Sequence, residues 1–132
     1  MARGTSSRDE RGAASIEMVI LLPALFAVLF LGLQAALYFH ARTIAIAAAQ
    51  EGARAAAADQ AGSQDGVIAA RAYLADAGDS LESSRASARR TATTATVTVR
   101  GRALSVIPGW KPAITQHASA EVERLTAPGE PR

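Results

Sequence analysis

The chain has 132 residues, of which 49% are apolar and 20% are charged, so it has room for at most one small domain. Alanine alone accounts for 32 residues, and about half of the other apolar residues lie between Ile16 and Phe39. The remainder has too few large apolar side chains to offset the chain entropy of a large enzyme core. A net charge of +2 without a basic stripe argues against nucleic-acid binding, and the absence of cysteine excludes disulfides and thiolate-bound zinc.

A membrane-spanning segment is the first element that the pattern predicts. From Met18 to Phe39 there are 22 residues without a charge, which at ~1.5 Å per residue make a helix of roughly 33 Å, enough for a hydrocarbon core of ~30 Å. The run is longer than the apolar region of a cleavable secretory signal. We therefore expect a short leader over residues 1–12 in the cytoplasm, a single transmembrane helix over 13–39 in the cell membrane, and an extracytoplasmic C-terminal part.

Two features lie within the predicted span. Pro23 lacks a backbone donor and predicts a bend near the start of the helix. Gly32 and Ala36 are four residues apart, so they form a notch of small residues that admits a second helix closely. The alternative is that such a pair arises by chance in an alanine-rich sequence.

The residues that follow the span predict more helix. Residues 40–61 are rich in alanine, the best helix former, so the membrane helix should continue as one rod whose small face suits packing against other helices in a bundle or filament. Residues 62–90 predict a loop that contains one short amphipathic helix over 67–77, after a breaker at Gly62–Gly66 and ended by Gly78. Within this segment, the Ser/Arg-rich stretch Ser80–Arg90 is expected to be irregular.

Residues 91–125 predict a small β module. Apolar and polar residues alternate in Ala95–Ile107, where Gly101 suggests a bulge or bend, and again in Ile114–Val122, with a turn signal at Pro108-Gly109 between the two runs. Two antiparallel strands backed by the 67–77 helix make the fold class α+β, with a small antiparallel hairpin or sheet. Residues 126–132 are expected to be a flexible tail.

The chain is not expected to be an enzyme. His117, Ser119 and Glu121 share one face of the last strand, but alternate side chains stand ~7 Å apart, beyond the ~3 Å reach that a nucleophile and base require. A solvated polar face is the better interpretation. No phosphate-binding loop, paired catalytic acids or metal-ligand spacing occurs elsewhere. We therefore expect no catalytic residue, cofactor, metal or small-molecule substrate.

The junction between leader and span carries the most informative pattern. The charged leader ends in Arg11-Gly12, and Glu17 is the fifth residue after that glycine, directly before the apolar run. A helix N-terminus tolerates such a carboxylate, but a charge at a membrane edge usually has a partner. Cleavage after Gly12 would free an ammonium group on Ala13. Glu17 would pair with it in its own or an adjacent subunit and so fix the register of packed helices.

At these residues the sequence resembles the prepilin-like proteins of the type IV pilus superfamily, and above all the TadE-like pseudopilins of the tight-adherence (Tad/Flp) pilus assembly system. The resemblance runs from Glu10 to about Ala58 and rests on Arg11-Gly12, Ser15, Glu17, Leu22-Pro23 and the segment 51–56, which reads EGARAA. It implies cleavage between Gly12 and Ala13 by a prepilin peptidase, Glu17 as the register residue, and other pilin-like subunits and the Tad machinery as partners.

One departure favours a minor subunit, because Met18 stands where the major pilins of this system carry an aromatic residue. The alternative function is an uncleaved single-pass anchor that presents a small extracytoplasmic binding module.

Overall fold

A computed structural model describes residues 6–125 of the chain. In chain order the elements are α1 (Ser6–Ala57), α2 (Ser63–Asp76), β1 (Leu81–Arg90), β2 (Thr94–Ala103) and β3 (Ala113–Glu121). The predicted α+β class is confirmed, with a long N-terminal helix, a short second helix and an antiparallel sheet. The predicted tail and the first five residues of the predicted leader lie outside the described residues.

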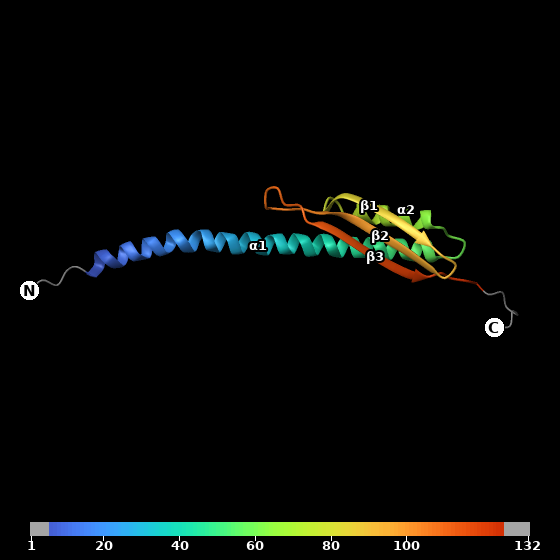
Figure 1. The fold of residues 1–132 in the computed structure, drawn as a ribbon, viewed down its shortest axis with the longest axis horizontal. Coiled ribbons are helices and arrows are strands. Elements are labelled where there is room, and N and C mark those ends of the chain that lie inside the picture. Colours follow the sequence, from blue (N-terminus) through green and yellow to red (C-terminus); the bar gives the residue numbers. More distant parts are fainter. Residues whose placement is uncertain (1–5, 126–132) are drawn as a thin grey trace, which may run out of the picture.

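Helix α1 dominates the molecule. Its 52 residues make a rod of roughly 78 Å at the standard helical rise, and it passes without interruption through Pro23 and Gly52. Because it begins at Ser6, the described part of the predicted leader belongs to the same helix. Figure 1 shows that the N-terminal half of α1 projects alone and curves away from the line of the rest, whereas its C-terminal half lies against the other elements.

The C-terminal half of α1 and the elements that follow it form a two-layer unit, residues 41–125, which we name the head. The three strands form one sheet in the order β1-β2-β3, and both neighbouring pairs are antiparallel. Helices α1 and α2 lie side by side on one face of this sheet, with α2 nearer β1 and α1 nearer β2 and β3 (Figure 1). The predicted antiparallel pairing of the last two strands is confirmed.

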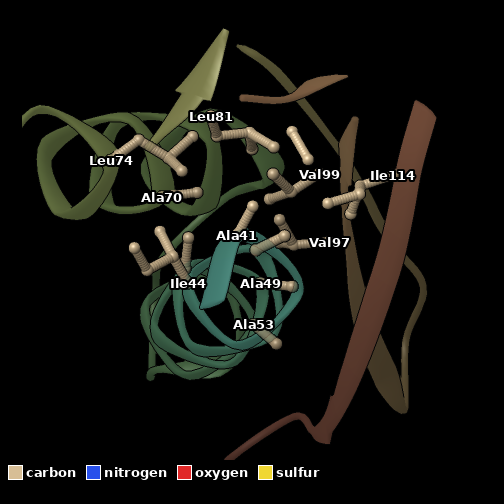
Figure 2. Packing of buried hydrophobic residues seen from close by; sticks show 13 residues of the cluster. Ala41, Ile44, Ala49, Ala53, Ala70, Leu74, Leu81, Val97, Val99 and Ile114 are labelled. Carbon is tan, nitrogen blue, oxygen red and sulfur yellow. The ribbon is translucent and has the colours of Figure 1, made fainter. Parts of the chain in front are cut away.

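The core of the head is built mainly from alanine. Val97 and Val99 of β2 are its largest fully buried side chains, and they face the alanines of α1, among them Ala41, Ala49 and Ala53 (Figure 2). The alanines of α1 let this helix approach the sheet closely, so the interior is filled with few bulky side chains from the helix.

The alanine-rich rod therefore packs differently from the expectation. Its small face is covered by the sheet and α2 of the same chain, and is not left free for helices of other subunits. The outward face of this half of α1 is polar and carries Arg42, Gln50, Glu51 and Arg54, with Glu51 and Arg54 paired at 3.0 Å.

Two local predictions were wrong. Ser80–Arg90 was expected to be irregular, yet residues 81–90 form edge strand β1, whose inward side chains are chiefly Leu81, Ala86 and Ala88. Two alanines among serines and arginines do not produce a visible hydrophobic alternation. Helix α2 begins at Ser63 and not at 67, because the Asp65 carboxylate accepts a hydrogen bond of 2.7 Å from the Gly62 backbone and caps the first turn. Its predicted end beside Gly78 is confirmed within one residue.

The bulge lies on β1, opposite Gly101, and not on β2 at Gly101 itself. The register shifts between Glu82 and Arg85, so two serines of β1 lie opposite the single Gly101 of β2. Gly101 has another role, since a Cβ there would come within 2.5 Å of the Leu81 side chain. The glycine thus leaves room for Leu81 to enter the core.

Candidate anchoring and assembly segment

The projecting half of α1 has the surface of a membrane span. Its large apolar side chains from Ile16 to Leu33 are about half to three-quarters exposed, and they point in every direction around the helix. Within the described residues, α1 is the one helix long and apolar enough to cross a membrane. Such a surface is unfavourable in water and favourable in lipid, so α1 fits a single-pass membrane anchor.

The predicted processing residues lie near the start of this helix. Gly12 and Ala13 are exposed, and a Cβ at Gly12 would meet nothing within 4 Å. The backbone is helical here, and the Ser15 hydroxyl donates a 2.9 Å hydrogen bond to the Arg11 carbonyl. A glycine costs about 1 kcal/mol relative to alanine inside a helix, so Gly12 marks a point where this turn unwinds easily.

Glu17 is exposed one helical turn after Ala13. Residues four apart lie on the same face of a helix, so an ammonium group on Ala13 would be within reach of the Glu17 carboxylate. Among residues 10–125, no cation lies within ion-pair distance of this carboxylate. The arrangement leaves Glu17 available to a partner of the kind that the register hypothesis requires.

The predicted helix-packing notch is open. Gly32 and Ala36 are both exposed on α1, and a Cβ at Gly32 would meet nothing within 4 Å. The head does not cover this notch, which remains accessible to a second helix. Its use for packing stays a prediction.

Gln34 is a feature that the sequence analysis missed. It lies inside the uncharged run, yet it is only 3% exposed, because the chain between β2 and β3 folds back onto it. Its Nε2 donates to the Leu104 carbonyl at 3.3 Å, and its Oε1 accepts from the Val106 backbone N–H and the Ser105 hydroxyl, both at 2.9 Å. The signal was present as the one amide side chain within an otherwise apolar segment.

The chain between β2 and β3, residues 104–112, is named the proximal loop. It reaches back along α1 beyond the sheet, as Figure 1 shows, and ends beside the last turns of the predicted span. An apolar groove of about 400 Å³ separates loop and helix. The residues that line it are Leu31, Gln34, Ala35, Tyr38, Phe39, Trp110 and Pro112.

The remaining polar candidates lie on the surface. His117, Ser119 and Glu121 are exposed on the outer face of β3, and the Ser119 hydroxyl lies 2.8 Å from that of Thr96 on the neighbouring strand. His40 is exposed on α1. Within the part of the chain that the structure describes, no three His, Asp or Glu side chains come together in a group that could hold a metal ion.

Comparison with known proteins finds one matching segment in the chain. Residues 12–54 match the family model described as TadE-like protein. The match begins at Gly12, includes Glu17, Gly32 and Ala36, and ends in the alanine-rich half of α1. No curated protein matches the chain, and no solved structure does so.

The match and the exposed apolar surface of α1 together support a membrane protein associated with a Tad pilus. The resemblance inferred from the sequence is confirmed over residues 12–54, where the N-terminal helix of this chain is similar to the TadE-like family.

Proposed function

We propose that this chain is a non-enzymatic minor pseudopilin that contributes to assembly of a Tad/Flp-type pilus. A prepilin peptidase would remove residues 1–12 on the cytoplasmic side, and the head would lie outside the cytoplasm. The observation that carries the proposal is the order of features along one helix, within the segment that matches the TadE-like model. An exposed Gly12 is followed five residues later by Glu17, which has no ion-pair partner among residues 10–125, and then by an apolar surface long enough to cross a bilayer.

The proposed processing gives Glu17 its function. Cleavage creates a positive charge on Ala13, and in the low-dielectric region beside lipid an unpaired carboxylate is costly. Glu17 therefore pairs with the Ala13 ammonium of its own chain or of a neighbour. When the pair joins two chains, it sets how far one helix is displaced along the other.

The packing of the head limits where neighbouring helices bind. The alanine face of residues 41–57 is already covered, so close helix–helix contacts with other pilin-like subunits through small residues fall to the projecting half of α1. Gly32 and Ala36 provide the closest approach there.

The alternative, an uncleaved anchor that presents a binding module, is favoured by one observation: the head closes its own core without a second chain. Replacement of Gly12 by leucine separates the two functions, because only the pseudopilin function requires a glycine at the cleavage site. In cells that lack the wild-type chain, the pseudopilin function predicts that Gly12→Leu is inserted in the membrane but does not restore surface pili.

Gly32→Leu is not an adequate control in that experiment, since it alters the helix-packing notch. Gly62→Ala is better matched, because Gly62 precedes α2 and a Cβ there meets only the Asp65 carboxylate at an ordinary 3.7 Å. Normal piliation in Gly12→Leu cells would overturn the proposed processing and favour the uncleaved anchor.

A further inference from the structure

We propose that the proximal loop is a second membrane contact, in which Trp110 lies at the headgroup level of the bilayer that α1 spans. The proposal rests on the membrane anchorage by α1 that the proposed function shares, but it needs neither cleavage nor pilus assembly. The occupant of the groove between loop and helix is phospholipid, and the head rests on the membrane surface through this loop.

The depth of the loop along α1 is the first argument. The exposed stretch Ile16–Leu33, which is uncharged apart from Glu17, has 18 residues, or roughly 27 Å of helix, which nearly fills a hydrocarbon core of ~30 Å. Gln34, the next residue, is the one that the proximal loop covers. The loop therefore lies at the level where hydrocarbon gives way to headgroups.

Aromatic side chains gather at this level. Trp110 is 50% exposed, and it lines the groove together with Tyr38 and Phe39, whose rings lie edge to face at 5.7 Å. Tryptophan and tyrosine are enriched at membrane interfaces, where an apolar ring enters the lipid and the polar group stays hydrated. A groove with these walls suits the upper part of an acyl chain.

The backbone of the loop is suited to a region with little water. The N–H of Val106 donates to Gln34, that of Ile107 to the Ser105 hydroxyl at 3.0 Å, and that of Trp110 to the Ile107 carbonyl at 3.2 Å. Pro108 and Pro112 have no N–H group to satisfy. Irregular backbone is tolerated near hydrocarbon only when its polar groups find partners within the protein, and these three N–H groups do so.

Charge at the adjacent end of the sheet points to anionic headgroups. Arg85 on β1 and Arg100 on β2 lie directly opposite each other, and Arg102 follows on β2. Two guanidinium groups placed in this way repel each other unless a negative charge is nearby. All three are exposed, and among residues 10–125 none has an ion-pair partner. Glu82, the acidic residue beside them, is paired with Lys111 at 2.6 Å. Anionic lipid would supply the missing charge.

The chain offers a direct probe, because Trp110 is its only tryptophan. The full-length protein is reconstituted in phosphatidylcholine vesicles with and without phosphatidylglycerol, and Trp110 fluorescence is quenched by acrylamide from water or by nitroxide-labelled lipids from the membrane. We expect the shallow label to quench more than the deep label, and phosphatidylglycerol to reduce the access of acrylamide further.

The matched control moves the tryptophan to the far end of the sheet, with Ala92→Trp in a Trp110→Phe background. Ala92 is exposed in the β1–β2 turn, at the end of the head remote from the loop. We expect acrylamide to quench this tryptophan roughly threefold more strongly than Trp110, because one is in water and the other at the interface.

Equal acrylamide quenching at the two positions, or no effect of the lipid labels on Trp110, would overturn the proposal. Protection of Trp110 that grows with the protein-to-lipid ratio would overturn it as well, since a second copy of the chain would then cover the loop. If the protein resists alkaline extraction, any of these three results leaves the proposed function standing. Extraction of the protein by alkali would instead count against the membrane anchorage itself.

Discussion

A Cβ placed on Gly52 would lie 2.7 Å from the carbonyl oxygen of Gly66, so α1 and α2 contact each other backbone to backbone at these two glycines. The relationship is reciprocal, since a Cβ on Gly66 would lie 2.8 Å from the Gly52 carbonyl oxygen. Val97 of β2 closes the same contact from the sheet. The two helices thus meet at residues without a side chain, and Val97 packs against both of them.

Gly52→Ala is predicted to destabilise the head, because the atoms that it would strike are backbone and cannot move without separating the helices. The expected loss in free energy of unfolding is about 1–3 kcal/mol, as for other overpacked interiors. Denaturation of the full-length protein in detergent, followed by Trp110 fluorescence, measures it. Gly32→Ala is the control, since it meets nothing within 4 Å and should leave the head unchanged. Equal stability of both variants would contradict the close contact.

Gln34→Met is predicted to release the proximal loop from α1. The variant keeps the length of the side chain but leaves the Leu104 carbonyl and the Val106 N–H without their partner, at a cost of about 1–3 kcal/mol. Hydrogen exchange should show faster exchange at Val106 and unchanged protection in β2. Gln50→Met, an exposed amide on the same helix, should change neither. An unaltered Val106 rate in Gln34→Met would mean that other contacts hold the loop.

Arg90→Met is predicted to loosen the end of α1. The Arg90 guanidinium donates to the carbonyls of Ala58, at 3.3 Å, and Ala61, so it holds the turn that follows α1 against β1. We expect a loss of about 1–3 kcal/mol in thermal unfolding monitored by circular dichroism. Arg89→Met, on the exposed face of the same strand, should stay within about 0.5 kcal/mol of the wild type. A similar small loss of stability in both variants would show that the Arg90 hydrogen bonds do not stabilise this end of α1.

Glu17→Ala is predicted to leave membrane insertion and the head intact but to impair pilus assembly. The carboxylate contacts no cation among residues 10–125, so its loss removes no ion pair within them, while a neighbouring Ala13 ammonium would lose its partner. Counts of surface pili measure the effect. Glu51→Ala removes a carboxylate that forms only an exposed pair with Arg54, and it should preserve piliation. Wild-type piliation in Glu17→Ala cells would count against the register role.

The sequence was informative where large apolar residues set the pattern. The uncharged run 18–39 predicted the span, and the alternation around Val97, Val99 and Ile114 predicted β2 and β3 with the correct inward face. These elements can be recognised because a large apolar side chain indicates, without knowledge of its partners, that its position is buried or faces lipid.

What the sequence did not reveal depends on contacts between distant residues. Strand β1 was missed because its inward residues are mostly alanines, which look the same on a strand and in a loop. Gln34 was missed because its partners lie 70 or more residues away, in a loop with no distinctive pattern. Gly52 carries no signal of its own in the sequence, because its role exists only once Gly66 is packed against it.

The N-terminus of the mature protein tests the central proposal most directly. The chain is expressed in cells with an intact Tad system and in matched cells without the prepilin peptidase, and its intact mass is measured after extraction from the membrane. The pseudopilin function predicts a chain that begins at Ala13 in the first cells and retains residues 1–12 in the second. A full-length chain in both would contradict processing after Gly12.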